Sequence, residues 1–239
     1  MSEGFENMTG RKLTMFATDE AKHQLEVLLT AETGAYRSAM VELGYLLAKA
    51  LMTEINVSMP NSTHHEILMV STAEDADFLQ RGINQTLSRY GIPTKLAVFW
   101  NHHYQLSDNS SVAPIVHQYL QTGFETATTL VVVKSIISGS CVVRTNLIEL
   151  MDSLPNLQDI YILAPVMHKD AQHKLKAEFP EVISDKFRFI TFAIDAQRTK
   201  NGEVLPGIGG QVYERLGLSQ QPVLTGYLPE VVKQMAFKV

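Results

Sequence analysis

The sequence predicts an α/β protein: a five-stranded, mainly parallel sheet flanked by helices, with a β-arm and a C-terminal hood hairpin. Three observations predict this class. Short apolar runs of strand length alternate with segments of helical apolar spacing. Turn residues (Gly, Pro, Ser and Asn) separate most of these segments. The 239 residues are 45% hydrophobic and 19% charged, which is typical of one globular domain.

The N-terminal part is predicted to be a tail followed by two helices. Residues 1–15 are expected to form a flexible tail, because the first of them are polar and include glycine, and residues 16–239 a single domain. Apolar residues with helical spacing predict helices over 19–29 and 36–55.

The central part is predicted to alternate strands and helices. Five apolar runs are expected to be strands, at 67–70, 96–100, 128–133, 159–164 and 187–194. Helices are expected over 75–90, 141–154 and 168–179, with a short one over 116–122. The polar stretch 101–111 is expected to be a loop or an exposed hairpin arm, because it lacks apolar periodicity. This alternation favours a parallel sheet covered on both faces.

Composition excludes several classes of function. The net charge of −5 gives no reason to expect nucleic-acid or anionic-membrane partners. The single cysteine, Cys141, excludes an internal disulfide framework. No apolar run approaches the roughly 20 residues of a membrane span, and no apolar leader segment is present. We therefore expect a cytoplasmic protein with no membrane partner.

A candidate phosphate site lies where the third predicted strand turns into a helix. Small hydroxyl residues surround a glycine in this turn, whose candidate phosphate-binding residues are Lys134, Ser138, Gly139, Ser140 and Cys141. Free backbone amides and the positive end of a helix favour phosphate at such a position. Serine and glycine also occur in such turns for conformational reasons alone, so a purely structural role stays open.

A second candidate site follows the last predicted strand. The strand ends at Asp195, a polar hairpin turns at Asn201-Gly202, and a Pro-Gly-x-Gly loop runs from Pro206 to Gly209. Glycine lets a ligand approach the backbone closely, so this hood (residues 195–216) predicts a wall of main-chain donors and acceptors.

Over residues 21–216, the chain resembles the uracil phosphoribosyltransferases, a branch of the type I phosphoribosyltransferases. The resemblance is most specific over 193–209 and is also present over 131–140. It implies that Val204, Ile208 and Gly209 contact or shape a pyrimidine-base site. It also implies a homodimer or larger homo-oligomer, and Mg²⁺ as a cofactor only if transferase activity is retained.

Three positions depart from the family pattern. Lys134 replaces the acid that the family uses for ribose hydroxyls. Glu74 and Asp75 replace an arginine turn that grips pyrophosphate, and Gly210 replaces an aspartate. We expect these two acids to be a solvated helix start that repels pyrophosphate. No catalytic residue is identified, and the His64-His65 and His102-His103 pairs lack the spacing of metal ligands, so no metal site is predicted.

Three functions stay open. The first is a divergent uracil phosphoribosyltransferase-like protein that binds a pyrimidine base or nucleotide with weak or no transferase activity, as a pseudoenzyme or regulator. The second is an active enzyme that makes UMP and pyrophosphate from uracil and phosphoribosyl pyrophosphate. The third is a structural or interaction protein that reuses the scaffold. Changes in three elements that, by the resemblance, handle the pyrophosphorylated sugar favour the first.

Overall fold

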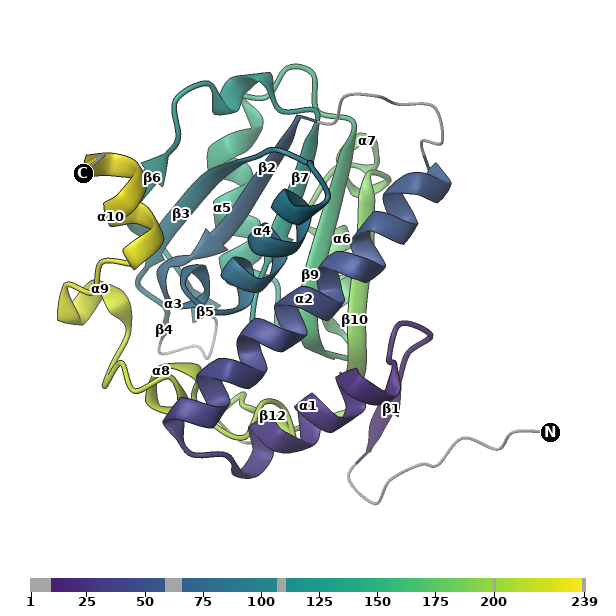
Figure 1. Cartoon of the computed structure of the whole chain (residues 1–239), viewed down its shortest axis with the longest axis vertical. Helices are drawn as coiled ribbons and strands as arrows, with labels where there is room; N and C mark the ends of the chain where they lie inside the picture. Colours follow the sequence, from purple (N-terminus) through teal and green to yellow (C-terminus); the bar gives the residue numbers. More distant parts are fainter. Residues whose placement is uncertain (1–9, 59–65, 107–110, 200, 238–239) are drawn as a thin grey trace.

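The computed structural model is a three-layer α/β structure, described here for residues 10–58, 66–106, 111–199 and 201–237. The predicted fold class is confirmed: all five expected strands are present and helices cover the sheet (Figure 1). Among the described residues, no helix combines the length and the apolar character that crossing a membrane requires.

The strands and helices are as follows. The strands are β1 (Arg11–Leu13), β2 (Ile67–Thr72), β3 (Thr94–Asn101), β4 (Tyr104–Gln105), β5 (Ser111–Val112), β6 (Ile115–Leu120), β7 (Thr129–Val133), β8 (Ile136–Ile137), β9 (Asp159–His168), β10 (Phe187–Asp195), β11 (Gln197–Arg198) and β12 (Val204–Leu205). The helices are α1 (Asp19–Thr30), α2 (Thr33–Ser58), α3 (Ala73–Ala76), α4 (Leu79–Arg89), α5 (Cys141–Met151), α6 (Ala171–Ala177), α7 (Glu181–Ser184), α8 (Val212–Arg215), α9 (Pro222–Thr225) and α10 (Glu230–Phe237), with a 3₁₀ turn at Phe124–Thr126.

The main sheet has the strand order β1-β10-β9-β7-β2-β3-β6, with β8 paired to β9 beside β7. The five strands from β10 to β3 are parallel, whereas β1 and β6 close the two edges in antiparallel fashion. From β2 the chain moves outward to β3, and then returns to the other side of β2 with β7. The neighbours β2 and β7 are therefore the point at which the strand order reverses, where open α/β sheets bind ligands.

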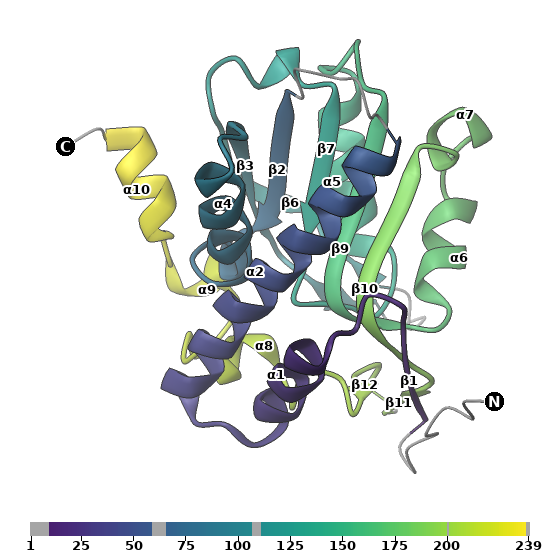
Figure 2. The same cartoon turned by 45° about the vertical axis from the view of Figure 1, so that its right-hand side comes forward.

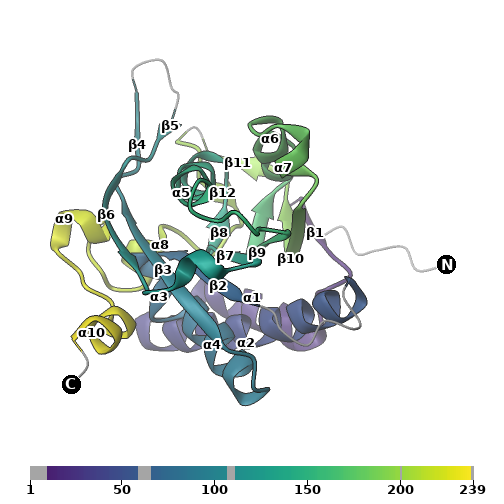
Figure 3. The ribbon, with the colours of Figure 1, turned by 90° about the horizontal axis from the view of Figure 1, so that it is seen from above.

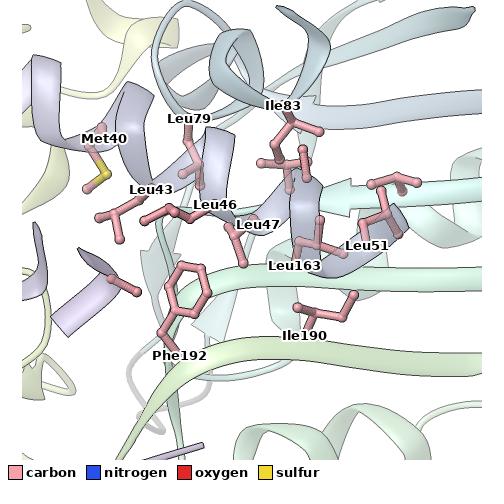
Figure 4. Packing of buried hydrophobic residues seen from close by; sticks show 14 of the residues in the cluster. Met40, Leu43, Leu46, Leu47, Leu51, Leu79, Ile83, Leu163, Ile190 and Phe192 are labelled. Carbon is pink, nitrogen blue, oxygen red and sulfur yellow. The ribbon is translucent and has the colours of Figure 1, made fainter. Parts of the chain in front are cut away.

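Two apolar layers hold the helices to the sheet. Seen from above, α1, α2 and α4 cover one face and α5, α6 and α7 the other (Figure 3). The side chains of β2 alternate between the layers, since Met69 belongs to the first cluster and Leu68 and Val70 belong to the second. Figure 4 shows the first cluster, where leucines of α2 lie between α4 and Phe192 of β10.

Helices α2 and α4 cross in close backbone contact. A Cβ atom added at Gly82 would lie 2.0 Å from the carbonyl oxygen of Val41, and one added at Gly44 would lie 2.1 Å from that of Leu79. Only glycine fits at these two positions, because real Cβ atoms essentially never approach a backbone atom within 3.0 Å.

Several predicted elements differ from the structure. The expected helix over 116–122 is wrong: Ile115–Leu120 forms the edge strand β6, because its backbone pairs with β3. The expected helix over 75–90 divides into α3 and α4, since Phe78 has non-helical backbone angles (φ −122°, ψ −85°). The expected helix over 168–179 starts only at Ala171, because residues up to His168 continue β9 and pair with β10.

Three further segments lie along the edges of the structure: β1, the hairpin arm and the C-terminal helices. The expectation of a flexible tail over 1–15 is wrong for Arg11–Leu13, which forms β1 against β10; residues 1–9 lie outside the described residues. In the polar stretch that was expected to be a loop or hairpin arm, β4 pairs with β5, while residues 107–110 lie outside the described residues. Beyond the hood, α9 and α10 follow the β3–β6 edge of the sheet (Figure 2). Asp77 anchors this C-terminal segment, accepting hydrogen bonds from the Tyr227 hydroxyl and the Glu230 amide, both at 2.7 Å.

Candidate functional site

A cavity of about 910 Å³ opens at the carboxyl ends of β2, β3 and β7. It lies at the reversal of the strand order, and its wall includes the turn before α5, the hairpin arm and the hood. In Figure 2 the hood elements β11, β12 and α8 lie beyond this same end of the sheet. The volume is within the range of small-molecule sites in proteins, roughly 300–1,000 Å³.

The floor of the cavity contains a buried cluster of one cation and two anions. Lys134 Nζ lies 2.7 Å from Asp75 Oδ2, 2.8 Å from Glu74 Oε1 and 3.0 Å from Thr72 Oγ1. An ammonium group has three N–H donors, so these contacts use all of them. Burial opposes the charge of Lys134, but the carboxylates of Asp75 and Glu74 outweigh it and raise the pKa of the lysine.

The expectation that Glu74 and Asp75 are solvated is therefore wrong. Their side chains are 7% and 0% exposed, because Lys134 neutralises part of their charge. Asp75 also accepts hydrogen bonds from Thr72 Oγ1 and from the backbone and hydroxyl of Ser135. The two turns thus bind each other: the acids lie in the turn after β2 and the cation lies in the turn after β7.

The residues of this cluster do not fit Mg²⁺. Glu74 and Asp75 are the acids that could bridge such an ion, and both already bind the ammonium group of Lys134. Among the described residues, no group of three or more His, Cys, Asp or Glu side chains has the arrangement of a metal site. His64 and His65 lie outside the described residues.

The predicted phosphate residues all lie on the cavity wall. Helix α5 begins at Cys141, and Ser140 before it makes no side-chain cap hydrogen bond. The first backbone N–H groups of α5 therefore have no capping acceptor and face the cavity with the positive end of the helix. Ser140 Oγ instead donates to Glu178 Oε1 at 2.6 Å, and burial raises the pKa of the Cys141 thiol.

The three predicted base-binding residues do not lie together on the cavity wall. Val204 lies on the cavity wall, whereas Ile208 and Gly209 do not. Ile208 is buried in the first apolar cluster, and a Cβ atom at Gly209 would lie 2.3 Å from the carbonyl oxygen of Leu28 in α1. The Pro-Gly-x-Gly loop thus packs on α1. The hood residues that line the cavity flank this loop: Arg198, Thr199, Asn201, Gly202, Glu203 and Val204 precede it, and Gly210, Gln211, Val212 and Tyr213 follow it.

A buried ion pair fixes the hood to the sheet. Arg11 of β1 binds Asp195 with two contacts of 2.7 Å, and it donates a third hydrogen bond to the carbonyl oxygen of Gly207 at 2.6 Å. Asp195 in turn accepts from the Gly207 amide at 2.8 Å. Sequence reasoning missed Arg11, because it placed this residue in the tail.

Further polar residues of the cavity were not predicted. Arg198 of β11 lines the hood side, and its Nε and Nη2 atoms are buried without a hydrogen-bond partner in the described part of the chain. Asn101 and His103 line the arm side. Burial, followed by the charge of Lys134, lowers the pKa of His103, so its imidazole is neutral at neutral pH.

Comparison with known proteins gives structural likenesses only. No family model and no curated protein matches the chain. The AQ2163 protein from Aquifex aeolicus is similar in structure, with a TM-score of 0.67 and 15% identity over 87% of this chain and 99% of that one. At this identity the likeness shows a shared fold and no activity.

Two looser likenesses fall below the level that supports a conclusion. The hypoxanthine-guanine phosphoribosyltransferase of L. donovani has a TM-score of 0.43 and 11% identity over 64% of this chain and 78% of that one. A hypothetical protein from Neisseria gonorrhoeae with bound ppGpp also has a TM-score of 0.43, with 13% identity over 76% and 93%.

Proposed function

We propose that this chain binds a pyrimidine nucleotide, for which UMP is the reference ligand, and has weak or no phosphoribosyltransferase activity. The observation that carries the proposal is the set of contacts of Lys134. Its three donors are directed to Thr72, Glu74 and Asp75, so the cation beside the cavity floor is not free for an incoming anion.

The phosphate of the ligand would bind at the start of α5. The turn before this helix lines the cavity, and its uncapped N–H groups supply donors without needing Lys134. Lys174 and Arg198 line the same cavity and add positive charge near a bound phosphate. We assign the phosphate to Ser138, Gly139, Ser140 and Cys141, and the base to the hood side near Val204.

Phosphoribosyl transfer would require groups that the proposed phosphate site at the start of α5 does not supply. Phosphoribosyl transfer expels pyrophosphate, whose developing charge requires free cations or a metal ion in the transition state. One ammonium against two carboxylates leaves the floor cluster with one negative charge, which disfavours a bound pyrophosphate.

Calorimetry with UMP, uracil and UTP tests the binding half of the proposal. Gly139→Asp places a negative charge at the start of α5 and should weaken UMP binding by at least about tenfold. Gly139→Ala is the matched control, because a Cβ atom at this position meets no other atom within 4 Å. A silent titration with all three ligands would instead favour the scaffold role.

An assay of UMP formation from uracil, phosphoribosyl pyrophosphate and Mg²⁺ tests the second half. We expect no turnover above background with the unmodified protein. Robust turnover would establish the alternative, an active uracil phosphoribosyltransferase.

A further inference from the structure

Counting only the described residues, the cavity has donors without partners on one side and acceptors without partners on the other. The donor side consists of the first amides of α5 and the guanidinium of Arg198. The acceptor side lies at the ends of β2 and β3, and its two groups are Glu74 Oε2 and Asn101 Oδ1. No part of the proposed phosphate or base binding uses this acceptor side.

The sheet register brings these two acceptors to the ends of neighbouring strands: Asn101 is the last residue of β3, and Glu74 lies in α3, two residues beyond the end of β2. Thr72 pairs with Phe99, and each acceptor residue lies two positions further along its strand direction. Both residues line the cavity.

Glu74 has one carboxylate oxygen to spare. Lys134 donates to Oε1 at 2.8 Å, and within the described parts of the chain Oε2 accepts no hydrogen bond. The residue is only 5% exposed and lines the cavity. A carboxylate oxygen that is largely removed from bulk water favours a hydrogen-bond donor, which water or a ligand in the cavity can supply.

Asn101 also has an acceptor oxygen to spare, here on a neutral amide group. Its amide nitrogen donates to the carbonyl oxygen of Ala113 at 3.1 Å and to Asn146 Oδ1 at 2.8 Å. These two acceptors fix the orientation of the amide, so Oδ1 is the atom left over. Among the residues that the structure describes, Oδ1 is buried without a partner, in a residue that is 8% exposed.

We propose that Glu74 and Asn101 form an acceptor subsite for the vicinal hydroxyls of a ribose, so that the cavity selects a ribonucleotide over its 2′-deoxy counterpart. Two acceptors at the ends of the adjacent strands β2 and β3 could each accept a hydrogen bond from one of two neighbouring hydroxyl groups. A ribose whose phosphate occupies the α5 turn presents those hydroxyls away from the phosphate, and so away from the repulsion of Glu74. This inference rests on the proposed nucleotide binding and names the group that reads the sugar.

The experiment compares the affinities of UMP and dUMP by calorimetry for the unmodified protein, Glu74→Gln and Glu203→Gln. A hydrogen bond to a charged group contributes enough that we expect UMP to bind roughly tenfold more tightly than dUMP. In Glu74→Gln this ratio should fall to about one to three, chiefly through weaker UMP binding. Glu203→Gln is the matched control, because it removes a carboxylate from the hood side of the same cavity and should keep the ratio.

A second pair of ligands tests recognition of the ribose independently of the identity of the base. Ribose 5-phosphate and 2-deoxyribose 5-phosphate differ in the same hydroxyl and carry no pyrimidine. Preference for the ribose form, lost in Glu74→Gln, would support the acceptor subsite even if uracil is not the base. Equal binding of the two members of each pair would overturn the subsite and leave nucleotide binding intact. If none of the four binds, the proposed function and the subsite both fail. Unchanged thermal unfolding of Glu74→Gln shows that the variant is folded, since Lys134 keeps its contact with Asp75.

Discussion

Lys134 Nζ lies 2.7 Å from Asp75 Oδ2, which joins two turns that are 59 residues apart in the sequence. The register explains the contact: Ser71 of β2 pairs with Val133 of β7, so the residues that follow the two strands meet at one edge of the sheet. Opposite charges at these two positions stabilise each other where either alone would be an uncompensated buried charge.

Removing the cation of this cluster should destabilise the protein strongly. We expect Lys134→Met to lower the free energy of unfolding by about 3–5 kcal/mol, because two buried carboxylates lose their counterion. Lys174→Met is the control, since Lys174 is exposed on α6 and a change there should stay within about 0.5 kcal/mol. Urea denaturation measures both variants. Equal free energies of unfolding for the two variants would mean that the cluster of Lys134, Glu74 and Asp75 does not stabilise the fold.

The contact between α2 and α4 should respond to a single methyl group. Gly82→Ala is expected to destabilise the protein by at least about 1–3 kcal/mol, since its Cβ atom would overlap the carbonyl oxygen of Val41. Gly34→Ala lies on α2 with nothing within 4 Å of the new atom, and should be neutral or slightly stabilising. Thermal unfolding measures the stability of both variants. Equal unfolding temperatures would contradict the inference that only glycine fits at position 82.

His168 should make stability depend on pH near neutrality. Burial, followed by the charge of Arg198, lowers the pKa of His168 below its usual value of 6.5. Its Nδ1 accepts from the Asp170 amide at 3.2 Å, which favours the neutral ring. The unfolded chain therefore binds more protons below this value, so His168 lowers stability as the pH falls from about 7 towards 5.

Measuring the free energy of unfolding at several pH values, in variants and in the unmodified protein, isolates the contribution of His168. His168→Asn should show a shallower loss of stability on acidification than the unmodified protein. His173→Asn, which changes an exposed histidine of α6, should keep the original slope. Identical slopes for both variants would rule out a contribution from His168.

The sequence predicted the parts of the fold whose signal is local. The five parallel strands are runs of apolar residues such as Leu130–Val133, which are buried on both faces and need no partner to be recognised. Edge strands carry a weaker signal. β6 is largely exposed, and only its pairing with β3 makes Ile115–Leu120 a strand rather than a helix.

The sequence indicated part of the cavity wall but not the electrostatics of the cavity, and phosphate binding at this wall stays a prediction. The turn at 138–141 lines the cavity as expected, because the ends of parallel strands and the starts of helices meet at one edge. The pairing of Lys134 with Glu74 and Asp75 was missed, although opposite charges directly after two apolar runs were a signal for it. Asn101 and Arg198 left no local pattern, since their role depends on which atoms lack partners after folding.

The ion pair between Arg11 and Asp195 should control the order of the hood. Arg11→Met leaves Asp195 buried with no cation and removes the hydrogen bond to the Gly207 carbonyl, so we expect a loss of about 3–5 kcal/mol in stability. Amide hydrogen exchange should also rise in residues 204–210, because the Gly207 amide donates to the same carboxylate. Lys12→Met is the control on the same strand, since its side chain is exposed.

Because Val204 joins this loop to the cavity wall, loosening of the loop should weaken UMP binding as well. Faster global unfolding without a local rise in exchange would show instead that the pair stabilises the whole domain and leaves the hood unaffected.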